Sequence, residues 1–164
     1  MKAKAGVLIV VALAIWGMKR HYSDARAEQL SWVLTPTATL VSAATGVTFT
    51  QEPGEGYLSR ERRFVIEKSC AGVNFMIAAF GMSALVLWHR VRSWPSAIGV
   101  LVLSAAASYL TAIAVNATRI ATALWLSVPA EAHRIEGITV YFGGLVLLYE
   151  VEQRWDRFAI SRHR

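Results

Sequence analysis

Four runs of apolar residues dominate the sequence, and their length limits what the chain can fold into. They cover residues 5–18, 70–88, 96–115 and 137–151. A helix needs about 20 apolar residues to cross the hydrocarbon core of a bilayer. The composition agrees, because 55% of the residues are hydrophobic and 17% are charged, against about 25% charged in average soluble domains. The sequence therefore predicts an all-α, polytopic membrane helix bundle of four or five spans.

The number of spans depends on residues 30–49, which are moderately apolar but rich in Thr, Ser and Pro. These residues leave open whether the segment crosses the bilayer or lies at its surface as an amphipathic or re-entrant helix. The first run is followed by Lys19-Arg20-His21 and not by a small-residue cleavage site. We therefore expect an uncleaved anchor. In the last run, Gly143-Gly144 predicts a point of close helix packing.

Residues 50–69 form the one sizeable hydrophilic stretch between the apolar runs. Glu52-Pro53-Gly54-Glu55-Gly56 has the composition of a turn. The apolar triplet Phe64-Val65-Ile66 is typical of a short strand. We predict that residues 50–69 make a small hairpin cap outside the bilayer.

The basic residues predict which ends of the helices face the cytoplasm. The formal net charge is +6, but the bases lie at the ends of apolar runs, which favours topology control and contact with anionic headgroups over nucleic-acid binding. The Arg90/Arg92 loop and the C-terminal arginines should both be cytoplasmic. The helix that begins at Cys70 then runs inward, and the next one returns outward. We therefore expect Cys70, Arg119 and His133 to meet at the external face.

Cys70 is the one cysteine in the sequence. Ser69 is a preferred N-cap residue, so we expect Cys70 in the first turn of the helix that follows. Free backbone N–H groups and the helix dipole favour a thiolate there. The alternative is a buried, inert thiol, as free cysteines commonly are. A single cysteine excludes an internal disulfide, a CxxC redox pair and a cysteine zinc cage.

Four further polar residues are candidates to act with this thiol. Arg119 follows a spanning run and supplies the positive donor that an attacked carbonyl needs, or else it reaches out to headgroups. His133 is a candidate acid–base residue or a solvated loop residue. Asn74 would lie one turn beyond Cys70 and orient it, or join two helices. Asn116 precedes Arg119 by three residues and is a candidate to position it. No spacing of His, Asp and Glu indicates a metal site, and we expect no cofactor.

Three segments together resemble the exosortase/archaeosortase family, most closely its short exosortase K branch. They are residues 67–75 (EKSCAGVNF), residues 116–120 (NATRI) and His133. The similarity extends from about residue 22 to residue 151. Members of the family are polytopic membrane enzymes, proposed to act as cysteine transpeptidases on exported proteins. Their substrates end in a sorting signal made of a short motif, a transmembrane helix and a basic tail.

The resemblance implies a role for each candidate residue. Cys70 would be the nucleophile, Arg119 the family's arginine and His133 the acid–base residue, with Asn74 and Asn116 in support. Residues 1–29 would be an anchor and polar connector, and residues 30–164 the catalytic domain. The implied partners are membrane-anchored exported proteins and the lipid bilayer, and the implied location is the bacterial inner membrane, with the site facing outward. A non-catalytic membrane subunit and a small transporter remain as alternatives.

Overall fold

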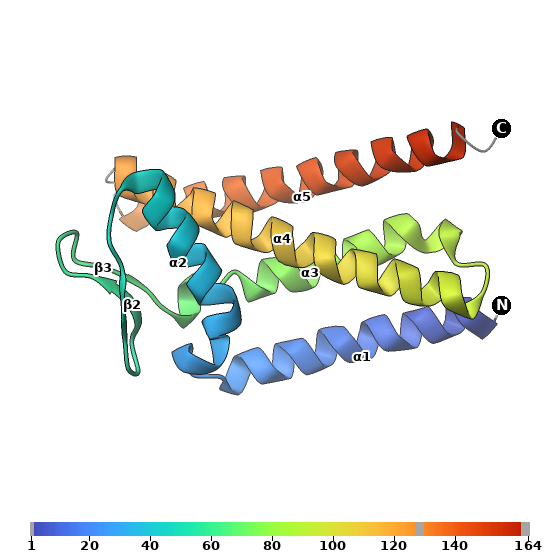
Figure 1. Cartoon of the computed structure of the whole chain (residues 1–164), viewed down its shortest axis with the longest axis horizontal. Coiled ribbons are helices and arrows are strands. Elements are labelled where there is room, and N and C mark those ends of the chain that lie inside the picture. Colours follow the sequence, from blue (N-terminus) through green and yellow to red (C-terminus); the bar gives the residue numbers. More distant parts are fainter. Residues whose placement is uncertain (1, 127–129, 162–164) are drawn as a thin grey trace.

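The chain folds into a bundle of helices with a small sheet at one end (Figure 1). This computed structural model describes the backbone of residues 2–126 and 130–161, and the side chains of residues 130–134, 156 and 159–161 lie outside the description. Its α-helices are α1 (Lys2–Asp24), α2 (Ser31–Thr45), α3 (Val73–Val86), α4 (Trp94–Leu126) and α5 (Ala130–Ser161). Short 3-10 helices precede α2 and flank α3, namely η1 (Ala27–Leu30), η2 (Lys68–Cys70) and η3 (Leu87–Arg90).

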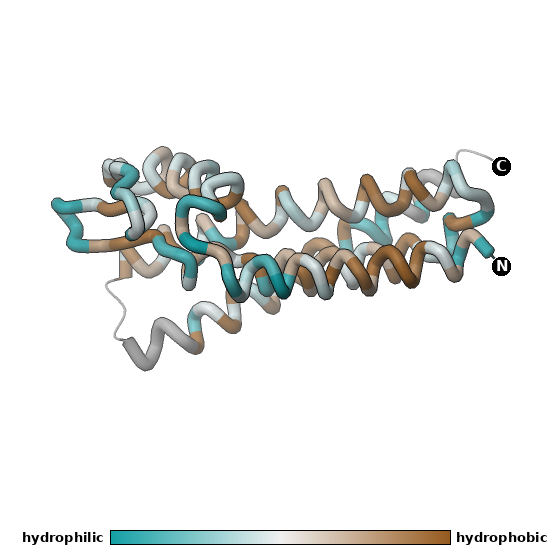
Figure 2. The backbone as a smooth tube through the Cα atoms, turned by 90° about the horizontal axis from the view of Figure 1, so that it is seen from below, coloured by the Kyte–Doolittle hydropathy of each residue, from teal (hydrophilic) through white to brown (hydrophobic). Residues whose placement is uncertain are grey.

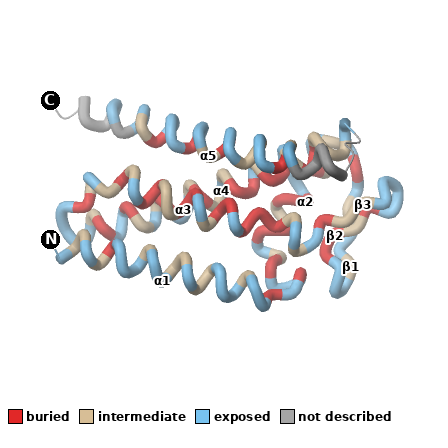
Figure 3. The backbone as a smooth tube through the Cα atoms, turned by 180° about the vertical axis from the view of Figure 1, so that it is seen from behind, coloured by how far each residue is buried: buried red, intermediate tan, exposed pale blue. Residues whose placement is uncertain are grey.

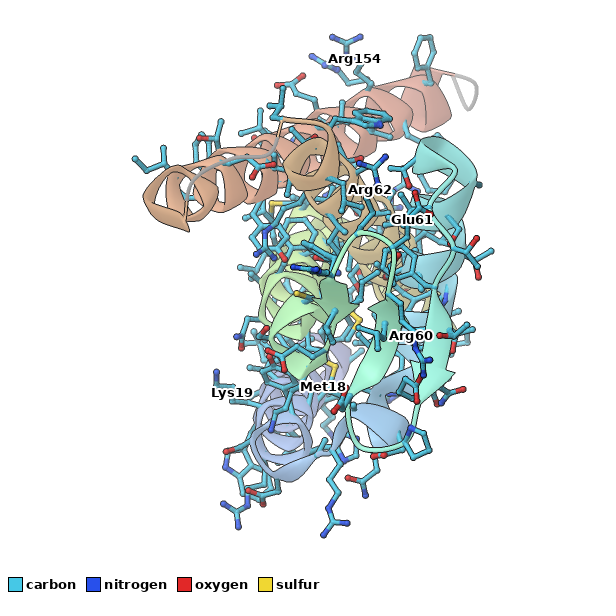
Figure 4. All side chains as sticks on the ribbon, turned by 90° about the vertical axis from the view of Figure 1, so that its left-hand side faces the viewer. Met18, Lys19, Arg60, Glu61, Arg62 and Arg154 are labelled. Atoms are coloured by element: carbon cyan, nitrogen blue, oxygen red, sulfur yellow. The ribbon has the colours of Figure 1, made fainter. Side chains whose placement is uncertain are left out.

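Helices α1, α3, α4 and α5 run along the long axis, and α2 crosses them near the sheet (Figure 1). Helices α3 and α4 lie at the centre, with α1 and α5 on opposite sides of them (Figures 1 and 4). The start of α1, the end of α5 and the turn between α3 and α4 lie at the end of the bundle opposite the sheet (Figure 1). The predicted, mainly helical architecture is therefore correct.

Two helical segments of the described chain are long and apolar enough to cross a membrane, Lys68–Arg90 and Trp94–Leu126. The predicted bundle of four or five spans is thus not confirmed. Helix α2 has 15 residues, which extend about 22 Å, less than the roughly 30 Å of a hydrocarbon core. The predicted spanning run at residues 96–115 lies inside the longer helix α4, which continues through Asn116 and Arg119.

The main core lies near the sheet, where α2 packs against α3 and α4 (Figure 3). Its fully buried side chains include Leu34 and Val41 of α2, Ala79 of α3 and Ile120 of α4. A second, smaller cluster at the other end joins the first helix to the α3–α4 turn, and it comprises Val7, Leu87, Val91, Ala97 and Val100. Between them, apolar residues follow the long helices, while hydrophilic ones gather at both ends (Figure 2).

Helices α4 and α5 approach closely at one glycine. A Cβ on Gly144 would lie 2.6 Å from Cγ2 of Val115 and 3.3 Å from Cζ of Phe75. Gly143 has no neighbouring atom within 4 Å of such a Cβ. The predicted close-packing point is therefore correct for Gly144 and wrong for Gly143.

The cap is a three-stranded antiparallel sheet made of β1 (Thr50–Glu52), β2 (Gly56–Ser59) and β3 (Phe64–Ile66), in that order. Its register pairs Gln51 with Tyr57 and Leu58 with Val65. The Tyr57 hydroxyl lies 2.5 Å from Oγ1 of Thr35, which ties the sheet to α2. The predicted strand at residues 64–66 is confirmed, and the predicted hairpin is part of a three-stranded sheet.

Candidate functional site

Cys70 lies in a short turn before α3 and not within that helix. It ends the 3-10 helix η2, and α3 starts three residues later, with Gly72 as its N-cap. The prediction that Ser69 caps the helix and that Cys70 occupies its first turn is wrong. The reason is Gly72, whose φ of +66° sets a left-handed break between the two helices. The Ser69 hydroxyl instead donates to Oε1 of Glu67 at 2.8 Å.

Asn116 of α4 holds this turn from the other side. Its Nδ2 donates a hydrogen bond to the backbone carbonyl of Cys70, and its side chain is fully buried. A Cβ on Gly72 would lie 3.2 Å from Cγ of Asn116, so the amide fits closely because position 72 has no side chain. Asn116, predicted to position Arg119, therefore contacts the cysteine turn directly.

A tyrosine of α5 joins Asn116 to Arg119. The Tyr141 hydroxyl lies 2.9 Å from Oδ1 of Asn116 and 3.1 Å from Nη1 of Arg119. The guanidinium of Arg119 also lies over the Tyr141 ring, with Cζ 5.4 Å from the ring centroid. Phe75 of α3 stacks on that ring at 5.2 Å. Hydrogen bonds thus connect Arg119, through Tyr141 and Asn116, to the backbone of Cys70.

Helix α1 supports the cysteine turn as well. The Tyr22 hydroxyl donates to the carbonyl of Lys68 at 3.1 Å, and Nζ of Lys68 donates to the carbonyl of Ser23 at 2.9 Å. The Lys68 ammonium also lies 5.4 Å from the centre of the Tyr22 ring. The end of α1 and the turn that carries Cys70 therefore hold each other by three contacts.

Asn74 does not have the predicted contact with the thiol among the described interactions. Its Oδ1 accepts a hydrogen bond from Nζ of Lys19 at 2.8 Å, which links α3 to α1. The helix-joining alternative is the one that this geometry supports. In Figure 4, Lys19 lies at the edge of the bundle, apart from the cap residues Arg60 and Arg62.

A pocket of about 400 Å³ lies beside the cysteine turn, between α1, α3 and α5. Ser69 and Gly72, on either side of Cys70, are part of its wall, and the Cys70 side chain itself is half-buried. Arg119 and Tyr141 also line the pocket. Its full lining is Tyr22, Ser69, Gly72, Val73, Asn74, Phe75, Arg119, Gly137, Ile138 and Tyr141.

The ionisable groups around the pocket act on one another. Partial burial raises the pKa of the Tyr22 phenol above its ordinary value. The negative charges that Tyr141, Cys70 and Glu67 carry when ionised raise this pKa further. The thiol and the two phenols therefore belong to one electrostatic cluster, although they come from three separate segments.

The predicted site residues thus divide into three groups. Cys70, Asn116 and Arg119 come together through Tyr141, and Asn74 lines the same pocket. The backbone of residue 133 lies in α5, but the His133 side chain is outside the described residues.

Within the described residues, no group of three His, Cys, Asp or Glu side chains could hold a metal ion.

Sequence reasoning missed Tyr22, Gly72, Gly137 and Tyr141. Gly137 matters because a Cβ there would lie 3.0 Å from Nε of Arg119. One signal was present: Gly137 and Tyr141 are four residues apart, so they share a helix face, and both belong to the apolar run at residues 137–151. Comparison with protein-family models, curated proteins and solved structures finds no match to this chain.

Proposed function

We propose that this protein is a membrane-embedded cysteine transpeptidase or protease of the exosortase type. Its substrates would be exported proteins that carry a C-terminal sorting signal and are anchored in the same membrane. The site would face the extracytoplasmic side of a bacterial inner membrane. Cys70 is the proposed nucleophile, Arg119 the electrostatic donor and His133 the acid–base residue.

One observation carries the proposal, namely the hydrogen-bonded connection between the backbone of the only cysteine and a partly buried arginine beside a pocket. Asn116 and Tyr141 join the Cys70 turn to Arg119. An arginine within an apolar helix is costly unless it is paired or reaches a water-filled site. Here it borders a pocket of about 400 Å³, large enough for the atoms around a peptide bond. A purely structural cysteine requires none of these features.

The proposed reaction has two steps. His133 takes the thiol proton, and the Cys70 sulfur forms a bond to the carbonyl carbon of the substrate while the carbonyl oxygen becomes an oxyanion that Arg119 stabilises. The carbon–nitrogen bond then breaks, and the leaving amine takes the proton from His133. Water or an acceptor amine attacks the resulting thioester and gives a proton to His133, the carbon–sulfur bond breaks, and the released Cys70 thiolate takes that proton back from His133. The family resemblance supplies the role of His133.

Exposed apolar side chains support the membrane setting. Large hydrophobic residues face outward on α1, α4 and α5, including Leu13 at 61%, Leu110 at 66% and Phe142 at 68% exposure. Surfaces of this kind are unfavourable in water but suited to lipid. Anchoring the enzyme and the substrate in one plane raises their effective concentration, so a pocket of modest size suffices.

The test exploits the fact that Cys70 is the only cysteine. Wild type, Cys70→Ser and Cys70→Ala are expressed in cells lacking the native copy. Exported proteins with a C-terminal apolar helix and basic tail are then sized by mass spectrometry. We expect cleavage to fall by about a thousandfold or more in both variants, because losing a nucleophile has effects of that order or larger.

A chemical control separates loss of the nucleophile from misfolding. A thiol-alkylating reagent added to wild-type membranes should block cleavage after folding is complete. Amounts of inserted protein should be equal in all samples. Cleavage that persists in Cys70→Ala, or in alkylated wild type, would refute the enzyme and favour a non-catalytic subunit.

A further inference from the structure

The direction of each hydrogen bond around Tyr141 follows from the chemistry of its partners. A guanidinium carries only donors, so the Tyr141 oxygen accepts from Nη1 of Arg119 at 3.1 Å. A phenol has one O–H, and this one is directed at Oδ1 of Asn116, 2.9 Å away. Tyr141 therefore accepts a hydrogen bond from the Arg119 guanidinium and donates one to the Asn116 amide.

This direction also fixes the amide of Asn116. With Oδ1 accepting from Tyr141, Nδ2 faces the Cys70 carbonyl and donates to it. A flipped amide would set the NH₂ group against the phenol hydrogen and the amide oxygen against a carbonyl oxygen, so both contacts would become repulsive. The orientation of the cysteine turn thus depends on a hydroxyl that is supplied by the last helix.

We propose that Tyr141 is a positioning residue for the reaction proposed above, an inference that rests on that function. Its hydroxyl holds the Arg119 guanidinium at the pocket wall and holds Asn116 in the orientation that supports the Cys70 turn. The packing of its ring between Phe75 and Arg119 keeps the hydroxyl in place. Tyr141 acts through these two neighbours and forms no bond to the substrate.

The informative variant is Tyr141→Phe, which keeps the ring stacking and removes only the oxygen. Arg119 then loses an acceptor and Asn116 a donor. Hydrogen bonds that involve a charged group contribute about 1.5–3 kcal/mol, which converts to a tenfold to roughly hundredfold change in rate. We expect kcat to fall by that factor while KM changes less than about threefold, because substrate-binding surfaces remain.

Tyr149→Phe is the matched control on the same helix. Tyr149 is 42% exposed, and its hydroxyl accepts a bond from Nε2 of Gln153 at 3.3 Å, far from the pocket lining. Its variant should have wild-type kcat and KM. If Tyr141→Phe behaves like this control, the inference is wrong.

Combination with Arg119→Lys tests whether Tyr141 acts through Arg119. If it does, the double variant should be little slower than Arg119→Lys alone, since residues in one network are not additive. Fully additive losses would make Tyr141 an independent structural residue and overturn the inference.

A second readout does not need any cleavage activity. The rate at which a small maleimide alkylates Cys70 at one fixed pH is measured in detergent for wild type, Tyr141→Phe and Tyr149→Phe. The nearby groups Tyr22, Glu67 and Lys68 stay unchanged in all three. We expect Tyr141→Phe to be alkylated faster, because an Asn116 amide without its Tyr141 partner holds the Cys70 turn less firmly and the half-buried thiol becomes exposed more often. The Tyr149→Phe rate should equal that of wild type.

The two readouts separate the possible failures. If wild type cleaves nothing but Tyr141→Phe is alkylated faster than wild type and Tyr149→Phe, the proposed function is wrong while the coupling of Tyr141 to the Cys70 turn stands. A Tyr141→Phe alkylation rate equal to that of wild type would refute the inference itself.

Discussion

At the scale of single residues, the missing side chain at Gly72 has the largest structural effect on the site. It permits both the left-handed backbone that separates Cys70 from α3 and the close approach of Asn116. A left-handed conformation costs an ordinary residue about 1–2 kcal/mol. The turn that carries the thiol is therefore compatible with glycine and strained with most other residues.

We predict that Gly72→Ala lowers the melting temperature in detergent by about 2–8 °C, at 2–4 °C per kcal/mol for a chain of this size. The new Cβ, 3.2 Å from Cγ of Asn116, must also displace the amide. We therefore expect the rate of cleavage to fall by more than the lower stability of the variant alone would explain. Gly143→Ala is the control, because it lies in a helix with open space around it. That variant should be as stable as wild type or more so. Equal melting temperatures for both variants would contradict the prediction.

The sequence predicted the residues whose chemistry is distinctive. A lone cysteine, an arginine in an apolar run and a nearby asparagine stand out without a structure, and Asn116 and Tyr141 link the backbone of Cys70 to Arg119. Tyr141 could not be found in this way, because a tyrosine in an apolar run is equally typical of a membrane interface. Its role depends on how α5 packs against α4, and small contacts such as that of Gly144 with Val115 determine this packing.

At the scale of elements, the cap is tied to the helices by a carboxylate. The side chain of Glu28 in η1 accepts a hydrogen bond from the backbone N–H of Gly54, in the turn between β1 and β2. Hydrogen bonds from its own backbone N–H and from that of Gly54 lower the pKa of Glu28, and the charge of Arg26 adds to this. The ionised form is therefore the one that holds the cap.

The lowered pKa sets how the Glu28–Gly54 contact depends on pH. The pKa of Glu28 is lower in the folded protein than in the unfolded chain, so the contact is fully present above the ordinary glutamate pKa of about 4.3. It is lost as the pH falls through the lowered pKa. We predict that the amide of Gly54 exchanges hydrogen faster in acid, relative to amides in α4 measured in the same sample. In Glu28→Gln this acid-dependent increase should be absent. An identical acid response in the variant would exclude Glu28 as its origin.

Among the elements, the cap was predictable and the continuity of α4 was not. The turn residues at 52–56 and the apolar triplet at 64–66 were enough to predict the cap, because short strands joined by turns depend mainly on local sequence. The polar residues at 116–119 follow the predicted spanning run, and α4 continues through them. Asn116 and Arg119 direct their polar groups to Cys70 and Tyr141, so the backbone keeps its helical hydrogen bonds. Partners on other elements cannot be seen in a local pattern.

At the scale of the whole molecule, basic residues collect at the end of the bundle away from the cap. Lys4 lies 5.8 Å from the centre of the Trp88 ring, which brings the start of α1 to the α3–α4 turn. Arg90 lies 5.5 Å from the Trp155 ring, which brings the end of α5 to the same turn. The sequence left the side of the N-terminus open, and the fold now indicates that it shares a side with Arg90 and Arg92.

We predict that reporters fused before Lys2 and after Arg92 both report the cytoplasm, because positive residues near helix ends stay inside. A reporter inserted between Gln51 and Glu55, in the cap, should report the outside. The insertion in the cap and the fusion after Arg92 act as controls for each other, because the predicted topology puts the two reporters on opposite sides of the membrane. A cytoplasmic result for the cap would put Cys70 on the wrong side for exported substrates.

The contacts of Tyr22 and Tyr141 have a consequence for synthesis. One tyrosine comes from α1 and the other from α5, so the cysteine turn is held from both sides only after the last helix has joined the bundle. While the ribosome is still making the chain, the thiol is already present, but Arg119 and Asn116 have no Tyr141 to orient them. A chain that stops before α5 therefore carries Cys70 with the contacts of α1 but without those that α5 contributes to the turn.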